Sequence, residues 1–358
     1  MFFNYAANLR FLIENDKFIT CFRGNVSKFA AGFLIRDSKD MLLDIILIIV
    51  SVAMVIWGAN LFTDGASRIA TLMRVPQIVI GLTVVSLGTS LPELCISLFS
   101  AVRGSPDMAV GNVVGSNIFN SMLIVGMSAA VMPITILRSS VRKDIPIATI
   151  ASVALVLICL DHEISRIDAL ILFLGFISFM WYTLRLAKAT GRSEDEEEKE
   201  TVSSEKQGSL WKHIAFIVVG IGALIVGSQI FVSCASQVAA RLHVSEAVIG
   251  LTIVAGGTSL PELATSLVSA YKGQSAIAIG NVIGSNVFNI LLILGLTGIV
   301  SPMSVYGITT LDFTMLIGSM LVLWGASYTD LKIERWEGIC MSLLFLAYMG
   351  WLIASAVA

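Results

Sequence analysis

Long apolar runs separated by short polar stretches dominate the chain from residue 41 onward. A helix needs about 20 consecutive apolar residues to cross a bilayer, and these runs are continuous rather than alternating with period two. The pattern therefore predicts an all-α integral membrane protein and not a barrel. We expect ten spans, at residues 41–62, 77–102, 108–132, 144–160, 167–187, 212–238, 246–271, 276–300, 310–328 and 337–357.

The two halves of the chain repeat each other at an offset of 169 residues. Residues 80–120 pair with residues 249–289 without a gap, and 26 of these 41 positions are identical. Each half carries five expected spans, and five is odd, so the second half must enter the membrane from the opposite side. Inverted repeats of this kind are found in secondary transporters, whose sites lie near the midplane where the halves meet. We therefore expect ten transmembrane helices arranged as two inverted five-helix repeats.

Two segments depart from the apolar pattern. Residues 1–40 mix apolar and basic residues without a run long enough to span, so we expect either an interfacial helix or a start codon assigned too early. The acidic run at 194–198 predicts a solvated linker, and it lacks the spaced ligands of a calcium loop. The expected division is an N-terminal extension at 1–40, a first repeat at 41–190, a linker at 191–210 and a second repeat at 211–358.

The positions of Lys and Arg indicate the orientation, because these residues accumulate in cytoplasmic loops. With the linker in the cytoplasm, most loop Lys and Arg residues lie on that side, and only Arg103, Arg166 and Arg241 lie outside among the loops after residue 41. We therefore expect a cytoplasmic linker and both chain termini outside.

Composition supports this class of protein and disfavours others. The 358 residues are 56% hydrophobic and 13% charged, with a mean hydropathy of +0.88, whereas a soluble globular chain carries about 25% charged residues. The net charge is −2, and no basic stripe or zinc spacing suggests a nucleic-acid partner.

The segment Gly-Thr-Ser-Leu-Pro-Glu occupies residues 88–93 inside one apolar run and recurs letter for letter at 257–262. An ionised carboxylate at the centre of a spanning helix costs roughly 2.5–3.5 kcal/mol. We therefore expect Glu93 and Glu262 to bind one cation together. The alternative is that both are buried acids with a structural role. The proline of each copy lacks an N–H and crowds the carbonyl four residues back. We expect each helix to open there, with carbonyls that a cavity, water or ion must satisfy.

Other oxygen-bearing side chains recur at helical spacing along the same spans. These hard oxygen donors suit calcium, which takes 6–8 oxygens at about 2.3–2.6 Å. Two carboxylates balance one divalent ion, or two to three monovalent ions at neighbouring positions. No thiolate or histidine cluster favours zinc or copper, and Asp44, Asp64 and Asp312 are expected to be structural. The polar residues expected to converge with the glutamates are Ser86, Thr89, Thr258, Asn112, Ser116, Asn120, Asn281, Ser285 and Asn289.

These motifs carry a family resemblance. Gly-Thr-Ser-Leu-Pro-Glu followed by Gly-Asn-Val-x-Gly-Ser-Asn-x-Phe-Asn, present twice, resembles the α-repeats of the sodium/calcium exchangers of the cation/calcium antiporter superfamily, in particular its prokaryotic members. Some members, including potassium-dependent exchangers, carry Asp at the place of Asn289, so the resemblance argues against potassium coupling. It implies acidic ligands at Glu93 and Glu262, carbonyl ligands at Thr89, Thr258, Ser86 and Ala255, sodium-holding residues at Ser90, Ser259, Ser116 and Ser285, and amides lining the centre at Asn120 and Asn289.

The expected function is a secondary active antiporter that exchanges calcium for sodium by alternating access. It would be no enzyme and would carry no cofactor besides the transported ions, and it would act as a monomer in a prokaryotic plasma (inner) membrane. The alternatives are calcium antiport coupled to protons or potassium, and a passive cation channel, which needs a continuous pore. The resemblance further implies that the first and sixth spans move, with Gly58 and Gly227 as bending points. Protons should inhibit, because protonation removes the charge of a ligand.

Overall fold

The computed structural model describes residues 41–193, 210–242, 253 and 255–357. The expected N-terminal extension lies outside these residues, as does most of the expected linker. Residues 1–46 and 47–358 form separate units; of the first, the described part is the beginning of helix α3. The second unit contains all the other described residues, and the four-part division of the chain stays a prediction.

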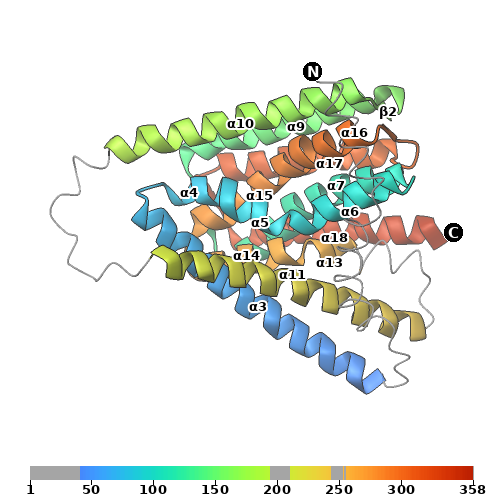
Figure 1. The fold of residues 1–358 in the computed structure, drawn as a ribbon, viewed down its shortest axis with the longest axis horizontal. Helices are drawn as coiled ribbons and strands as arrows, with labels where there is room; N and C mark the ends of the chain where they lie inside the picture. Colours follow the sequence, from blue (N-terminus) through green and yellow to red (C-terminus); the bar gives the residue numbers. More distant parts are fainter. Residues whose placement is uncertain (1–40, 194–209, 243–252, 254, 358) are drawn as a thin grey trace, which may run out of the picture. The chain divides into compact units, whose positions relative to one another are not determined.

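The first half of the chain is helical apart from two short strands. Pro92 and Pro106 each lie in the first turn of a helix, where the missing N–H leaves no intrahelical bond unmade. The elements (Figure 1) are α3 (Met41–Leu72), α4 (Gln77–Ile80), η1 (Gly81–Val85), α5 (Ser86–Thr89), α6 (Leu91–Val102), α7 (Pro106–Ile118), η2 (Phe119–Ile124), α8 (Val125–Val131), β1 (Ile134–Thr135), η3 (Ser140–Asp144), α9 (Ile145–Ile158), η4 (Cys159–Asp161), β2 (Glu163–Ile164) and α10 (Arg166–Ser193).

The second half repeats this order, and α11, α14 and α15 have the bounds of α3, α6 and α7 shifted by 169 residues. Thr309 and Asp312 form a capping box that starts α17. The elements are α11 (Leu210–Arg241), α13 (Ala255–Thr258), α14 (Leu260–Tyr271), α15 (Ser275–Val287), η7 (Phe288–Leu294), α16 (Gly295–Val300), β3 (Met303–Ser304), α17 (Thr310–Tyr328), β4 (Lys332–Ile333) and α18 (Arg335–Val357).

Within the described residues, eight helices are long and apolar enough to cross a membrane, and the pair Gln77–Thr89 and Leu91–Val102 forms a further span bent by 47°. These nine correspond to nine of the ten expected spans, and the class of all-α membrane protein is confirmed. The expected span at 246–271 lies partly outside the described residues. The first span was expected to end at residue 62, but α3 continues to Leu72. In the added length, Thr63 is buried and contacts the hydroxyl of Ser269 at 3.3 Å.

Helices α3 and α11, which open the two halves, pack antiparallel to each other. A Cβ added to Gly58 would lie 2.9 Å from the Cβ of Ala223, whereas one added to Gly227 would lie 2.8 Å from the side chain of Val55. The residue numbers therefore rise along one helix as they fall along the other, as an inverted repeat requires. Both glycines are close-packing positions within continuous helices here, and their use as bending points stays a prediction.

Two small strand pairs join the halves. Strand β1 pairs antiparallel with β4, with Ile134 opposite Ile333, and β2 pairs with β3, with Ile164 opposite Met303. Adding 169 to the numbers of β1 and β2 yields those of β3 and β4, so the two pairs are equivalent under the repeat. Each pair links a loop of one half to a loop of the other.

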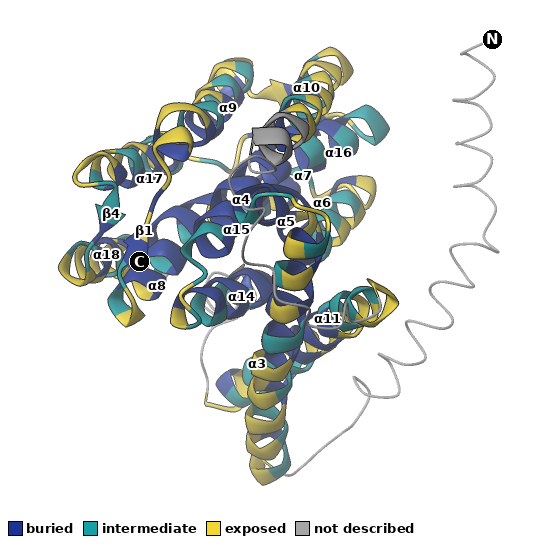
Figure 2. Ribbon diagram, turned by 90° about the vertical axis from the view of Figure 1, so that its left-hand side faces the viewer, coloured by how far each residue is buried: buried dark blue, intermediate teal, exposed yellow. Residues whose placement is uncertain are grey.

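The spans that follow the two motifs form the centre of this unit. In the most apolar 18-residue stretch of each span, 94% of the residues are buried in Ser275–Val300 and 72% in Pro106–Val131, but only 17% in Arg335–Ser355. In Figure 2, α15 is dark blue, and the outer helices carry yellow residues. Many of these exposed residues are large and apolar, such as Ile150 and Leu321, as expected for helices that face lipid.

Candidate cation site

Each sequence motif lies at a break between two helices. In the first half α5 ends at Thr89 and α6 begins at Leu91, and the helical bonding resumes where the Leu94 N–H donates to the Ser90 carbonyl at 3.1 Å. In the second half α13 ends at Thr258 and α14 begins at Leu260. The expectation that the prolines open both helices is confirmed. The main chain departs from the regular helical pattern at Ser90 and Ser259, one turn before each glutamate.

Glu93 and Glu262 lie in the first turns of α6 and α14, where the positive end of a helix favours an anion. Both side chains are almost fully buried, with 0% and 1% exposure. The hydroxyl of Ser259 donates to Oε1 of Glu93 at 3.1 Å, and the hydroxyl of Ser90 donates to Oε1 of Glu262 at 3.0 Å. Each glutamate is thus held by the serine of the other half, and the two carboxylates belong to one site.

The other predicted hydroxyl groups divide into two sets. Ser116 contacts the hydroxyl of Ser259 at 3.2 Å, and Ser285 is buried with its Oγ unbonded to any described residue. The hydroxyl of Ser86 instead lies 2.7 Å from the carbonyl oxygen of Gly81 on its own broken helix and 3.0 Å from that of Asn281 on α15. The carbonyl of Ser86, which the resemblance implies as a ligand, accepts the N–H of Ser90 at 3.0 Å. Its counterpart Ala255 is described only as the start of α13.

The four predicted amides also serve two purposes. Asn112 donates to the carbonyl of Glu93 at 3.3 Å, and Asn281 donates to the carbonyl of Glu262 at 3.3 Å. These two amides tie the motif helices to the spans that follow them. Thr89 adds a hydroxyl bond to Oδ1 of Asn281 at 3.1 Å. Asn112 and Asn281 therefore support the backbone of the site.

Asn120 and Asn289 lie in the π-helical segments η2 and η7, a kind of segment that is frequent at functional sites. Both residues are buried. Nδ2 of Asn120 donates to Asn286 at 3.1 Å, and Nδ2 of Asn289 donates to Asn117 at 3.0 Å. The Oδ1 atom of each has no hydrogen-bond partner among the described residues.

Five buried side-chain oxygens of the predicted site residues thus lack a partner among the described residues. An unsatisfied buried polar group costs about 1–3 kcal/mol, and more when it is charged. Elsewhere in the described chain such atoms also occur, among them the hydroxyl groups of Ser128 and Thr297, the ring Nδ1 of His213 and the amide oxygen of Gln274. The five atoms are all hard donors of the kind that calcium and sodium accept: Oε2 of Glu93, Oε2 of Glu262, Oγ of Ser285, Oδ1 of Asn120 and Oδ1 of Asn289.

Asn117 and Asn286 are contacts of the site that the sequence reasoning left without a role. Both are fully buried, and both lie within the quoted motif, three residues before Asn120 and Asn289. This repeated spacing of three was the available signal.

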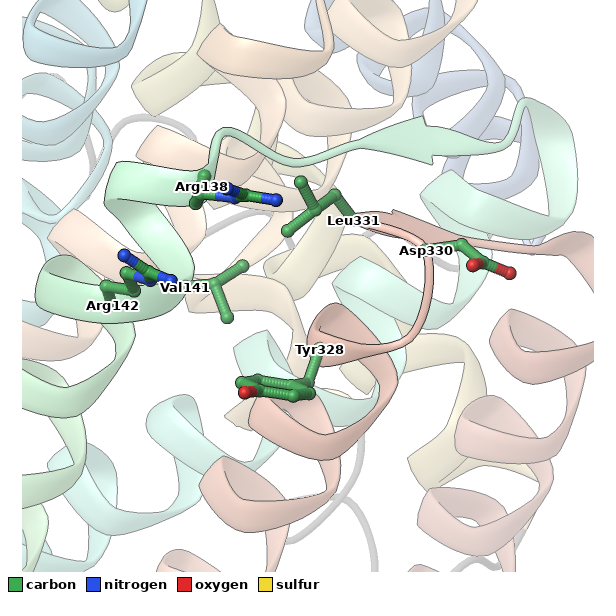
Figure 3. Close-up of a pocket in the computed structure, with 6 residues that line it drawn as sticks. All are labelled: Arg138, Val141, Arg142, Tyr328, Asp330 and Leu331. Atoms are coloured by element: carbon green, nitrogen blue, oxygen red, sulfur yellow. The ribbon is translucent and has the colours of Figure 1, made fainter.

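Several other polar residues have structural contacts, as expected. Asp64 forms an ion pair with Lys272 at 2.8 Å, and Asp312, besides capping α17, accepts the hydroxyl of Tyr348 at 2.6 Å. A separate cavity of about 330 Å³ lies between the segment around η3 and the end of α17. Figure 3 shows the carboxylate of Asp330 directed away from Arg138 and Arg142, which also line this cavity. It contains none of the predicted ion ligands; its lining residues are Arg138, Val141, Arg142, Tyr328, Asp330 and Leu331.

Known proteins share both the sequence and the fold of this chain. The sequence is 32% identical over 318 residues to the putative antiporter CaxA of Alkalimonas amylolytica, covering 87% of this chain and 98% of that protein. It is 30% identical over 338 residues to the sodium/calcium exchanger MaX1 of Methanosarcina acetivorans, covering 85% and 97%. The solved structure of the sodium-calcium exchanger NCX_Mj is similar with a TM-score of 0.74 and 29% identity, covering 86% of this chain and 98% of that one.

The family described as sodium/calcium exchanger protein matches this chain twice, at residues 43–185 and 212–354. The two matches fall on the two halves related by the offset of 169 residues. Each contains one copy of the Gly-Thr-Ser-Leu-Pro-Glu motif and its glutamate. The chain therefore belongs to the sodium/calcium exchanger family.

Proposed function

We propose that this protein is a secondary antiporter that exchanges calcium for sodium across a prokaryotic plasma (inner) membrane. The observation that carries the proposal is the pair of crossed serine–glutamate bonds, Ser259 to Glu93 and Ser90 to Glu262, which supports a single site shared by both buried carboxylates. Family membership supports the same class, since the family consists of transporters. No catalytic step and no resident cofactor are part of the proposal.

The charge of the site makes the two ions compete. Two ionised carboxylates neutralise one Ca²⁺ or two Na⁺, so either load can occupy the site but not both. The neutral oxygens of the neighbouring serine and asparagine residues complete the 6–8 ligands that calcium takes. The proposed ligands are Glu93, Glu262, Thr89, Thr258, Ser86, Ala255, Ser90, Ser259, Ser116, Ser285, Asn120 and Asn289.

Exchange further requires that the site open to one side at a time, and α3 and α11 are placed to control this. Both helices lie against the broken motif helices: a Cβ on Gly88 would lie 2.8 Å from Ile221 and 3.2 Å from Phe62. Val232 of α11 lies in the same way against Gly257. A shift of α3 and α11 against the remaining helices would expose the carboxylates alternately. If three Na⁺ exchange for one Ca²⁺, one net charge moves, and 100 mV contributes about 2.3 kcal/mol.

The arrangement in the cell is part of the same proposal. The distribution of loop arginines and lysines favours a cytoplasmic linker and external termini. Each protein copy contains both halves of the site, so a monomer in the lipid bilayer suffices for exchange.

Flux measurements with purified protein in sealed proteoliposomes test this function. Uptake of radioactive calcium should require an outward sodium gradient and collapse when monensin dissipates it. If a potassium or proton gradient drives calcium uptake equally well, then that ion can take the place of sodium as the coupling ion. Uptake down the calcium gradient without any counter-ion would indicate a channel and overturn the proposal.

A further inference from the structure

Four asparagine side chains form two crossed pairs between the halves. Asn120 of the first half donates to Oδ1 of Asn286 in the second at 3.1 Å, and Asn289 of the second donates to Oδ1 of Asn117 in the first at 3.0 Å. All four are buried, so no bulk water competes for these bonds. Each pair leaves one amide oxygen, Oδ1 of Asn120 or of Asn289, without a described partner.

The direction of the first pair is set by the chemistry around Asn286. Its Nδ2 donates to the hydroxyl of Ser121 at 2.7 Å and lies 3.3 Å from the sulfur of Met320. A thioether sulfur can only accept a hydrogen bond, and the hydroxyl of Ser121 already donates to that sulfur at 3.2 Å. The NH₂ group of Asn286 must therefore face Met320 and Ser121. The oxygen of Asn286 then faces Asn120, which can form a hydrogen bond to it only by donating from its own NH₂ group.

The second pair is set by a backbone acceptor. Nδ2 of Asn117 donates to the carbonyl oxygen of Asn286 at 3.2 Å. A carbonyl also can only accept, so the oxygen of Asn117 is left facing Asn289, which donates its NH₂ group in return. Two acceptor-only atoms, the sulfur of Met320 and the carbonyl of Asn286, thus determine the orientation of all four amides.

We propose that Asn117 and Asn286 are positioning residues of the transport site, which turn the amide oxygens of Asn289 and Asn120 toward the cation. A rotated amide would present two N–H donors to the cation instead of an oxygen. It would also place two oxygens against each other within the pair. The inference rests on the proposed function, because it assigns the neutral ligands of that site.

Double-mutant cycles on the transport site test the inference. Asn286→Ala should raise the half-saturating sodium concentration about tenfold, the equivalent of one hydrogen bond, and leave the maximal rate within about twofold. In an Asn120→Ala background the same change should have almost no further effect, because the ligand that Asn286 positions is absent. In an Asn289→Ala background it should retain its full tenfold effect. Equal effects of Asn286→Ala in the two backgrounds would overturn the inference.

The repeat supplies a second, matched cycle. Asn117→Ala should couple to Asn289→Ala and be additive with Asn120→Ala, the reverse of the first cycle. If Asn286→Ala elutes as an aggregate in size-exclusion chromatography, Met320→Leu takes its place, since it removes the sulfur acceptor at similar volume. Met320→Leu should then weaken sodium binding in the wild-type background and be silent beside Asn120→Ala; additivity there would count against the inference.

Failure of the inference is distinguishable from failure of the function. Wild-type protein without sodium-dependent calcium flux would reject the proposed exchange. Wild-type protein with normal exchange but additive cycles would reject only the positioning role. A calcium titration followed by thermal stability in detergent reads the same cycles without transport, and there too additivity would reject the positioning role.

Discussion

Replacing Glu93 with glutamine removes one of the two charges of the site at constant shape. The side chain is fully buried, and its Oε1 accepts the hydroxyl of Ser259 at 3.1 Å. Glutamine can keep that bond through its own oxygen, so its NH₂ group replaces Oε2, the oxygen that has no described partner. The variant therefore presents a neutral donor to the cation in place of a charged acceptor.

The loss of calcium affinity in this variant can be estimated from the burial of the Glu93 carboxylate. Two unit charges 4 Å apart interact by about 4 kcal/mol at an effective dielectric constant of 20, and calcium carries twice that charge. Part of this gain is offset by desolvation, and removing one partner of a buried ion pair typically costs about 3–5 kcal/mol. Glu93→Gln should thus weaken calcium binding by at least about 100-fold. Without cations, Glu93→Gln should raise the melting temperature, because it removes one of two neighbouring buried negative charges.

Thermal unfolding in detergent, with calcium or with a chelator, measures both effects. Calcium at 100 times its Kd should stabilise the wild type by about 2.7 kcal/mol, and at the same concentration it should stabilise Glu93→Gln by at most about 0.4 kcal/mol. Asp64→Asn is the matched control: it also removes one carboxylate, but from an exposed pair with Lys272, so stability changes by about 0–1 kcal/mol and the calcium response remains. A full calcium response in Glu93→Gln would refute the reasoning.

Three further expectations concern the crossed bonds, the packing and the charge of the site. Ser90→Ala removes the donor to Glu262, so the half-saturating sodium concentration in flux assays should rise about tenfold; an unchanged value would exclude a role in sodium binding. Gly284→Ala puts a Cβ onto the hydroxyl of Ser86, which should lower stability in thermal melts by about 1–3 kcal/mol, whereas Gly222→Ala, with open space around it, is the control and should not destabilise. Lowering the pH should reduce calcium flux by protonating the glutamates, and more calcium should restore it; inhibition that calcium cannot relieve would place the proton elsewhere.

The sequence pattern predicted the helices better than their ends. The span expected at 108–132 is observed at Pro106–Val131, because its apolar run coincides with the buried length of the helix. The end of α3 was missed by ten residues, since hydropathy cannot detect polar positions such as Thr63 that are buried against the other half.

The site shows a similar division. The carboxylates were identifiable because a charged group inside an apolar run is costly in any fold, and the repeat showed it twice. The repeated spacing marks Asn286, but the roles of Asn286 and Met320 could not be predicted, because a neutral amide and a thioether are ordinary in a buried helix. Their importance depends on partners such as Asn120 and Ser121, which lie 165 or more residues away along the chain.

The two strand pairs have a consequence for biosynthesis. Ile134 and Thr135 leave the ribosome early, but their partners Ile333 and Lys332 follow only after nearly the whole chain has been made. During insertion the first five spans are therefore in the bilayer before strand β1 can pair with β4. A chain truncated before residue 332 lacks strand β4 and cannot form the β1–β4 pair. Such truncated products should therefore be early substrates for membrane proteases.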